Sequence, residues 1–218
     1  MNKISPSVMC IDMLDFENQI KSLDAAGVDY YHIDIMDGHY VPNFALSTYT
    51  MQDIARVSKT PMDVHLMVTN PDQYIEVFAK AGAEIITPHI EALLHPIRTL
   101  KFIRSLGKKA GIAINPATDI SSIEYMLDFL DMVCVMTVDP GFAGQTLIPS
   151  TVNKITALRK MFDAAGKQID IMVDGQVKEE TAPMLTAAGA NVLVLGSSGL
   201  FKFKPSEYKE VVEKYKSM

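Results

Sequence analysis

Ionisable side chains lie inside three apolar stretches of the chain. His32 and Asp34 lie within YYHIDIM, His65 lies within MDVHLM, and Asp174 directly follows DIMV. A buried charge without a partner is costly, so four such groups that converge need a shared partner. A divalent cation supplies one, and two imidazoles with two carboxylates suit zinc, manganese, iron, cobalt or magnesium. Each residue alone is more simply a hydrogen-bonded polar group of the core, but the four together predict a metal site.

Two carboxylates beside a cation predict a proton transfer. The cation polarises a carbonyl and stabilises the enediolate that forms when the neighbouring carbon loses its proton. One of the two carboxylates, Asp34 or Asp174, can remove the proton from one face of that carbon, and the other can deliver a proton to the opposite face. The metal offsets their charge, so each aspartate can serve both as a ligand and as an acid or base. The expected outcome is inversion of one carbon centre next to a carbonyl.

Strand-like runs alternate with longer amphipathic segments along the chain, and no linker or low-complexity stretch divides them. Helix-like segments such as 16–27 and 71–82 end in glycine, which suits a helix C-terminal cap, and the last helix is expected at about 205–216. Eight strand-then-helix units in 218 residues predict an α/β fold of the (β/α)8 TIM-barrel type, formed by one domain over 1–218. The alternative is an open doubly wound sheet, but no G-x-G-x-x-G follows the first strand. The strand candidates are 3–9, 30–36, 62–67, 84–89, 109–114, 132–137, 170–173 and 191–196.

The alternation of side chains indicates which face of each strand lies inside the barrel. His32 and Asp34 share one face of their strand, while two isoleucines share the other. The strands that carry His65 and Asp174 repeat this pattern, so the polar faces are expected inside and the apolar faces under helices. In this fold the carboxyl ends of the strands carry the active site. Asp34 and Asp174 come from the second and seventh strands, which lie across a barrel, and this favours inversion by two bases over isomerisation by one.

Other polar and soft side chains are expected close to the four ligands. Asp63 and Asp170 lie one layer deeper, where they would support the ligands or only the structure. His39 is expected in a loop, and the roles of His89 and Glu91 stay open between support of the ligands and structure. Methionine inside a protein is usually core filler, yet a methionine wall would also exclude water from an enediolate. The methionines expected at the mouth are Met9, Met36, Met67 and Met136.

Three glycine-rich turns follow the last three predicted strands. They are DPGFAGQ at 139–145, VDGQ at 173–176 and LGSSG at 195–199. Glycine lets backbone N–H groups approach an anion closely, and loops after the last strands of a barrel often bind phosphate. Ser197 and Ser198 could add hydroxyl donors. Glycine at such turns is often merely geometric, but three of them beside a candidate metal site predict a phosphate site.

Composition excludes several other classes of protein. The net charge is −6 with no basic cluster, which gives no support for nucleic-acid binding. No apolar run is long enough to span a membrane, and no signal peptide is visible. Cys10 and Cys134 lack metal-type spacing and are expected to be free thiols, so a cytoplasmic location is expected. These observations give no support for a nucleic-acid or membrane partner.

Seven motifs together resemble one known family, from Ser5 to about Phe201. They are SPSVM, HIDIMDGHYVPN, DVHLMV, NPAT, VDPGFAGQ, VDG and LGSS, and they are similar to those of ribulose-phosphate 3-epimerases. The resemblance implies a metal-dependent epimerase barrel that forms a homo-oligomer and acts on a ketose phosphate. It implies that His32, Asp34, His65 and Asp174 bind the metal, and that Asp34 accepts and Asp174 donates the proton. It implies substrate contacts by Ser7, His65, Gly141, Phe142, Ala143, Gly144, Gly175, Gln176, Gly196, Ser197 and Ser198.

The phosphate turns depart from the pentulose-phosphate pattern. Gln176 stands where a second glycine is common, and Ala143 stands within GFAG where that group has GFGG. These changes resemble the D-allulose-6-phosphate 3-epimerase branch, whose substrate is one carbon longer. The expected reaction is therefore conversion of D-allulose 6-phosphate to D-fructose 6-phosphate. The alternative is conversion of D-ribulose 5-phosphate to D-xylulose 5-phosphate.

Functions of other classes fit the sequence less well. A Schiff-base aldolase needs an interior lysine near a strand end, and a decarboxylase of the orotidine phosphate type would carry D-x-K-x-x-D. Lys3 and Lys109 open their strands instead. A non-catalytic barrel that only binds sugar phosphates is a further alternative, but it predicts loss of Asp34 or Asp174, and both are present.

Overall fold

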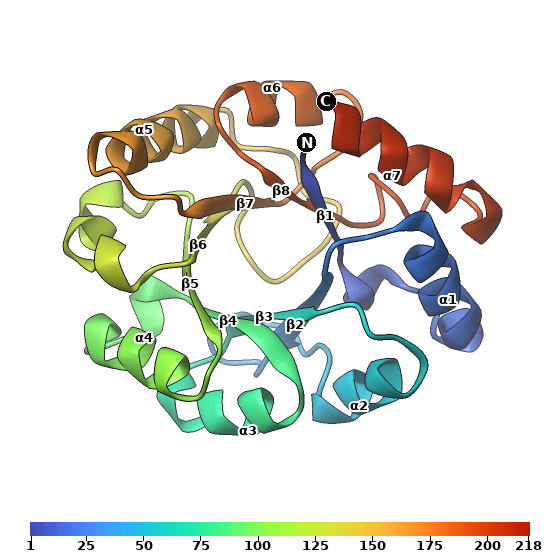
Figure 1. The fold of residues 1–218 in the computed structure, drawn as a ribbon, viewed down its shortest axis with the longest axis horizontal. Helices are drawn as coiled ribbons and strands as arrows, with labels where there is room; N and C mark the ends of the chain where they lie inside the picture. The colour runs from blue at the N-terminus through green and yellow to red at the C-terminus, as the bar shows by residue number, and fades with distance from the viewer.

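The computed structural model describes residues 1–218 and shows a ring of eight parallel strands inside a shell of helices (Figure 1). The predicted TIM barrel is confirmed, and most predicted strand ends agree with the observed ones within one or two residues. Strand β1 is shorter than expected, because Val8 begins a 3₁₀ turn. The strands are β1 Lys3–Pro6, β2 Tyr31–Met36, β3 Met62–Met67, β4 Ala83–Pro88, β5 Lys109–Ile114, β6 Met132–Met136, β7 Asp170–Asp174 and β8 Val192–Leu195.

The helices follow the strands in alternation. The α-helices are α1 Phe16–Ala26, α2 Thr48–Val57, α3 Ile75–Lys80, α4 Pro96–Ser105, α5 Ser150–Ala164, α6 Ala182–Ala187 and α7 Tyr208–Ser217. The 3₁₀ segments are η1 Val8–Cys10, η2 Met13–Asp15, η3 Pro71–Gln73, η4 Ile90–Ala92, η5 Ile120–Phe129 and η6 Pro205–Glu207.

The connection between β5 and β6 is the long 3₁₀ segment η5 and not an α-helix. Its apolar residues recur at every third position, at 120, 123, 126 and 129. A 3₁₀ helix has 3.0 residues per turn, so this spacing places all four on one face. Ile123 and Met126 are buried there. The apolar period of three therefore explains why this segment differs from the other connections.

Hydrogen bonds close the ring between β1 and β2, which excludes the open doubly wound sheet. The strands pair in the order β1-β8-β7-β6-β5-β4-β3-β2. Between the two ends of this series, Ser7 bridges to His32 in parallel fashion. The N–H groups of Asp29 and Tyr30 also donate to the carbonyl of Ile4, at 2.9 and 3.2 Å.

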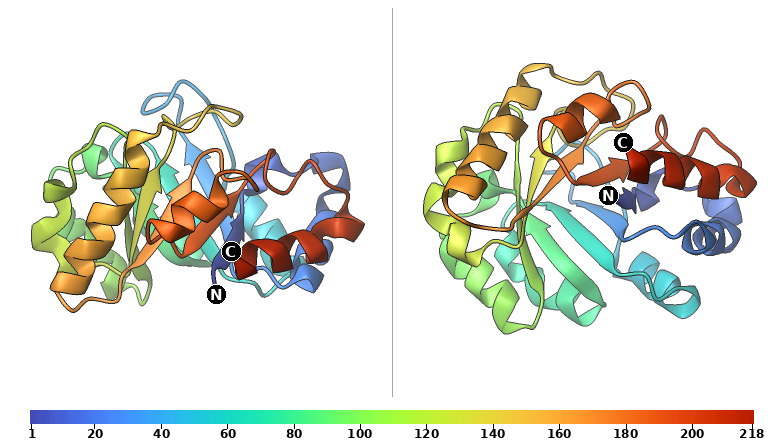
Figure 2. Two further views of the ribbon diagram at one scale, coloured as in Figure 1. Left: turned by 90° about the horizontal axis from the view of Figure 1, so that it is seen from above. Right: turned by 45° about the horizontal axis from the view of Figure 1, so that its top comes forward.

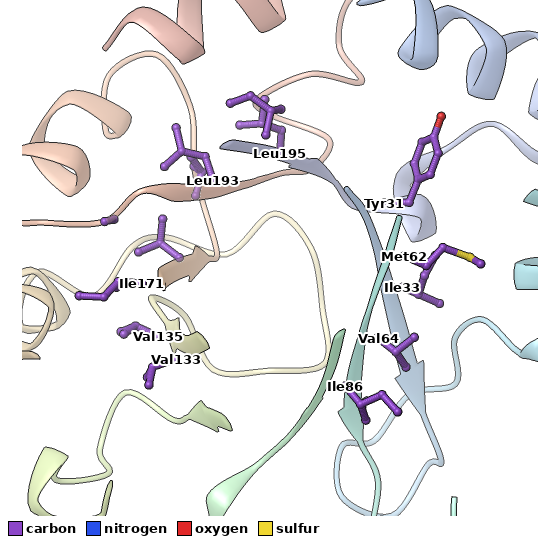
Figure 3. Packing of buried hydrophobic residues seen from close by; sticks show 14 of the residues in the cluster. Tyr31, Ile33, Met62, Val64, Ile86, Val133, Val135, Ile171, Leu193 and Leu195 are labelled. Atoms are coloured by element: carbon purple, nitrogen blue, oxygen red, sulfur yellow. The ribbon is translucent and has the colours of Figure 1, made fainter. Parts of the chain in front are cut away.

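The predicted alternation of faces is confirmed by the packing. Outward side chains such as Ile33, Val64 and Ile171 point from the strands toward the helices and belong to the main buried cluster (Figure 3). Inward residues such as Met132, Cys134 and Met172 form a separate buried cluster that fills the barrel. Both cysteines are free, as expected. The buried polar groups of this interior include His32, Asp34, Asp63 and His65, together with Ser5 and Thr87.

The two ends of the barrel differ in what they carry. The chain termini lie together at one end, where the N–H of Asn2 donates to the carbonyl of Lys216 at 3.2 Å (Figure 2). The loops after β2 and β6 project from the opposite end, and the β6 loop crosses the barrel opening (Figures 1 and 2). The carboxyl ends of the strands thus form a mouth that loops enclose. None of the helices is both long enough and apolar enough to cross a membrane.

Candidate metal centre and active site

Two histidines and two aspartates converge at the mouth of the barrel, as predicted. One ligand atom from each of His32, Asp34, His65 and Asp174 lies within 4.8 Å of those from the other three. His32 Nε2 lies 3.4 Å from Asp34 Oδ1 and 3.7 Å from Asp174 Oδ2. His65 Nδ1 lies 3.5 and 3.6 Å from the same two oxygens. The two ring nitrogens are 3.3 Å apart.

The parallel register of the strands sets this convergence. Asp34 on β2 lies beside His65 on β3, and His32 lies beside Asp63. On the other side of the barrel, Asp174 is the last residue of β7. Because side chains alternate along a strand, these residues all point to the inside. The cluster forms because the inward polar residues of three strands lie at similar heights along the barrel.

The spacing and chemistry of the four donors fit a divalent cation. Four donors about 2.1 Å from one cation in a tetrahedral site lie about 3.4 Å from one another. The five ligand-atom distances given above range from 3.3 to 3.7 Å. The two histidine side chains are 1% and 0% exposed, and that of Asp34 is 4% exposed, so water screens little of their charge. The cluster of His32, Asp34, His65 and Asp174 could therefore bind a metal ion.

Hydrogen bonds outside the cluster orient its members. The Nδ1 atom of His32 lies 2.6 Å from Asp63 Oδ2, which leaves Nε2 to face the cluster. The hydroxyl of Ser7 donates to Asp34 Oδ2 at 2.7 Å, while Oδ1 faces the histidines. Asp63 thus supports a candidate ligand, one of the two roles considered for it. An outer carboxylate that holds a histidine in this way is a common feature of metal sites.

The four groups impose opposite pKa shifts on the two aspartates. Burial raises the pKa of Asp34, but the His32 charge and hydrogen bonds from both histidines outweigh it, so this pKa is lowered. Burial and the neighbouring carboxylates of Asp34 and Asp63 raise the pKa of Asp174, although both histidines oppose them. Without a cation, Asp34 is therefore the stronger candidate for a base and Asp174 for an acid.

Two other residues that were considered lie away from the cluster. Asp170, at the start of β7, bonds to Lys3 Nζ at 2.6 Å and Asn191 Nδ2 at 2.7 Å, so its role is structural. His39 lies in the loop after β2, as expected. There the carboxylate of Asp37 accepts N–H bonds from His39 at 2.9 Å and Thr69 at 2.7 Å. The DGH sequence thus anchors the loop and contributes nothing to the cluster.

A cavity at the mouth joins the two aspartates to the glycine turns. It is lined by Asp34 and Asp174 together with the predicted substrate residues Ser7, Gly141, Phe142, Ala143, Gly144, Gly175, Gln176, Gly196, Ser197 and Ser198. All four predicted methionines also line it. His65 does not, because its side chain is fully buried, so the structure gives no direct contact between His65 and the cavity.

The glycine turns present free backbone donors to this cavity. The N–H groups of Gly144, Gly175, Gln176 and Ser198 donate to no backbone carbonyl. Gly175 has φ of +120°, and a Cβ there would lie 2.9 Å from the N of Val138. Only glycine fits that position, since a side chain would collide with the neighbouring loop. Free N–H groups on turns that line one cavity could form an anion site.

Gln176 connects two of the three turns. Its side-chain Oε1 accepts the N–H of Leu147 at 2.5 Å, which fastens the β6 loop to the end of β7. The residue has φ of +47°, a left-handed conformation that glycine also adopts. On the other side Asn43 Nδ2 donates to the carbonyl of Gly141 at 2.8 Å. The side chain of Gln176 thus holds the β6 loop, and the residue also lines the cavity.

We expect Gln176→Gly to weaken substrate binding without weakening metal binding. The glycine keeps the left-handed backbone but loses a hydrogen bond worth about 0.5–1.5 kcal/mol. The KM for the sugar phosphate should therefore rise roughly twofold to tenfold, with a smaller change in kcat. Steady-state kinetics at saturating metal measures this, and a metal titration serves as the control. An unchanged KM would contradict the positioning role of Gln176.

Some residues of the site could not be predicted from alternation. Cys10 and Asn43 lie beyond strand ends, where the period of two no longer applies, yet Cys10 lines the cavity and Asn43 holds its β6 loop. For Cys10, the available signal was its position three residues after Ser7. The turn η1 returns the chain to the mouth at that spacing.

The fold and the site together define a class of protein: a TIM-barrel enzyme with a candidate metal site and a candidate anion site at the strand ends. The family model described as the ribulose-phosphate 3 epimerase family matches residues 3–201. Ribulose-phosphate 3-epimerase of Bacillus subtilis is 46% identical over 199 residues, 91% of this chain and 92% of that protein. The Escherichia coli K12 protein of that name is 40% identical over 215 residues, 98% of this chain and 94% of its own. The chain belongs to the ribulose-phosphate 3-epimerase family, which is a family of carbohydrate isomerases.

Structural similarity extends beyond this family. A tryptophan synthase α-subunit of Pyrococcus furiosus superimposes with a TM-score of 0.70 at 16% identity, covering 100% of this chain and 97% of that one. At this level of identity the likeness concerns the barrel alone.

Proposed function

We propose that this protein inverts C3 of a ketose phosphate by two-base proton transfer, with one divalent cation held by His32, Asp34, His65 and Asp174. The observation that carries the proposal is the position of the two aspartates. They come from β2 and β7, both contact the histidine pair, and both line one cavity. A substrate carbon between them would have one carboxylate on each face, which is what inversion requires.

The residues of the chain would share the work of proton transfer. The cation, when bound, makes the hydrogen next to a carbonyl more acidic. Asp34 takes that proton from one face, and Asp174 supplies a proton from the other. In the reverse direction the two aspartates exchange roles. Ser7 donates to Asp34 Oδ2 at 2.7 Å and so holds the carboxylate in one orientation while Oδ1 faces the histidines.

The walls of the cavity support the same chemistry. Met36, Met67 and Met136 line it close to the aspartates. Their apolar side chains would keep water from the carbanionic carbon and limit loss of a phosphate or a stray proton transfer. At the other end, the free N–H groups of the three turns would hold the phosphate, without any lysine or arginine.

The names of the relatives favour the pentulose substrate. Eight relatives at 40–46% identity, including the B. subtilis and E. coli proteins, are named for ribulose phosphate. The expected preference for D-allulose 6-phosphate receives no specific support from them. D-ribulose 5-phosphate, converted to D-xylulose 5-phosphate, is therefore the first candidate substrate.

A hexulose phosphate remains a second candidate because of two residues at the phosphate end. Ala143 and Gln176 replace glycines of the pentulose pattern, and both line the cavity. Gln176 also fastens the β6 loop through Leu147. A substrate one carbon longer would place its phosphate farther from the aspartates, and these residues lie where such a change would act.

Steady-state kinetics with both substrates decides between them. The ratio of kcat/KM for D-ribulose 5-phosphate to that for D-allulose 6-phosphate is expected to exceed about 10, since a misplaced reacting carbon loses transition-state stabilisation. A ratio below 1 would establish the hexulose phosphate as the substrate. Absence of turnover with either, together with tight binding of both, would support the non-catalytic alternative. The homo-oligomer and the cytoplasmic location stay predictions.

A further inference from the structure

A row of hydrogen bonds leads from the candidate ligand His65 to the rim of the barrel. His65 Nε2 lies 2.8 Å from His89 Nε2, and His89 Nδ1 lies 3.2 Å from Glu91 Oε2. Both histidine side chains are 0% exposed, whereas that of Glu91 is 25% exposed. The planes of the two rings are inclined by 24°, with centroids 4.9 Å apart.

The ring nitrogens of His65 and His89 and the carboxylate of Glu91 allow one arrangement of protons that suits a metal site. A histidine binds a metal through a nitrogen without a proton, and Nδ1 is the atom of His65 that faces the cluster. The proton of a neutral His65 is then on Nε2, which donates to His89 Nε2. His89 must accept there, so its own proton is on Nδ1 and donates to Glu91. Each group in the row fixes the tautomer of the next.

The outer end of the row is held by three residues from two loops. Glu91 Oε1 accepts the N–H of Asn115 at 2.8 Å and the hydroxyl of Thr118, both beyond β5. Tyr40, in the loop after β2, donates its hydroxyl to Glu91 Oε2 at 3.2 Å. Its ring lies over that of His89, with centroids 4.8 Å apart. The carboxylate is thus held as an acceptor in a single orientation.

We propose that His89 and Glu91 are positioning residues that hold His65 as its Nε2–H tautomer and so keep Nδ1 available to a cation. The row resembles the contact of His32 with Asp63, where a carboxylate bonds directly to the outer nitrogen at 2.6 Å. In the second arm a neutral imidazole is inserted between the carboxylate and the ligand. This positioning role depends on the proposed metal site. The experiments below can show the positioning role to be wrong while the metal site is right.

Metal affinity in paired variants of His89 is the first measurement. His89→Gln keeps an acceptor for the proton of His65, and His89→Leu removes it. With purified metal-free protein titrated with Co²⁺ or Zn²⁺, His89→Leu should bind about 10–100-fold more weakly, the usual effect of losing an outer partner. His89→Gln should restore most of that loss. Equal weakening in both variants would show that packing alone matters and would overturn the proposal.

The tautomers themselves are the second measurement. Long-range ¹H–¹⁵N spectra of the five histidines should show His65 protonated on Nε2 and His89 on Nδ1 in the metal-free and Zn²⁺-loaded wild type. Glu91→Gln should introduce the Nδ1–H tautomer of His65 and lower metal affinity. Glu84→Gln is the matched control, because Glu84 lies on β4, the strand that precedes Glu91, is partly exposed and pairs with Lys109.

The outcomes distinguish the inference from the function on which it rests. A wild type that binds no divalent cation would contradict the proposed metal site. A wild type that binds metal, with Glu91→Gln and His89→Leu binding as tightly as Glu84→Gln, would overturn only the positioning role. Thermal unfolding of the metal-free variants identifies any that are misfolded. If either His89→Leu or Glu91→Gln is misfolded, the other is compared with Glu84→Gln.

Discussion

Replacement of Asp174 by asparagine is expected to lower kcat at least about 10³-fold while the barrel stays folded. A positioned acid or base contributes about 10²–10⁴-fold, and asparagine can neither accept nor donate the proton. Its amide can still offer an oxygen at the same place. The side chain is 18% exposed at the end of β7, so the substitution leaves the core intact. Asp34→Asn is expected to have an effect of the same size, since inversion needs both faces.

Steady-state rates at saturating Mn²⁺ or Zn²⁺, with bound metal measured on the same samples, test this expectation. Asp170→Asn is the control, because it changes the same residue type on the same strand at the far end of the barrel. It should affect stability more than turnover. A rate within tenfold of the wild type for either Asp34→Asn or Asp174→Asn, with metal bound, would be incompatible with two-base inversion.

Removal of the divalent cation is expected to abolish turnover and to lower stability together. The cluster places Asp34 and Asp174 beside two histidines in a buried site, and a cation would relieve the repulsion between the carboxylates. A ligand present at 100 times its Kd adds about 2.7 kcal/mol to the free energy of unfolding. For a chain of this size the melting temperature should fall by about 5–10 °C on dialysis against a chelator.

Metal affinity should also fall as the pH falls, and the sign follows from His32. Burial disfavours charge on this ring, but the carboxylates of Asp34 and Asp63 raise its pKa well above 6.5 in the metal-free protein. At a pH below the pKa that His32 has in the unfolded chain, the charged ring therefore stabilises the metal-free fold. This contribution is lost as the pH rises through the higher pKa that His32 has in the folded protein. Metal binding must displace that proton. Calorimetry in buffers of different ionisation enthalpy should detect its release near neutral pH.

Restoration of activity and melting temperature by a stoichiometric divalent cation would complete the test. Full activity after exhaustive chelation, with less than a tenth of an equivalent of metal remaining, would contradict a role for the cation. Unchanged stability on metal addition would contradict binding at the buried cluster. Glu84→Gln should respond as the wild type does, because that residue lies away from the mouth.

The site was largely predictable because strands impose a strict period on their side chains. Once Ile33 and Ile35 are assigned to the helix-covered face, His32 and Asp34 must point inward. The parallel register then brings His65 beside Asp34. The height of Asp63 was also predictable, whereas its contact with His32 Nδ1 depended on the rotamers of both side chains.

The remaining features depend on contacts that the strand period does not encode. The apolar residues of η5 recur every three residues, which is close to the 3.6-residue period of an α-helix, so an α-helix was expected there. Gln176 was predicted as a substrate residue from its place in a glycine turn, but its side chain bonds to Leu147. His89 and Glu91 lie at and beyond the end of β4, where a bridge and a 3₁₀ turn redirect the chain. Their roles became apparent only from the distances between their nitrogens and oxygens.

Exchange of the C3 proton with deuterium oxide in the two aspartate variants is the most direct test of the mechanism. With D-ribulose 5-phosphate and D-xylulose 5-phosphate in turn, each variant retains one base and should reach one face of the carbon. Asp174→Asn should introduce deuterium into one epimer, Asp34→Asn into the other, and neither should invert the centre. Inversion by either variant, or exchange into the same epimer by both, would contradict an epimerase in which Asp34 and Asp174 act on opposite faces.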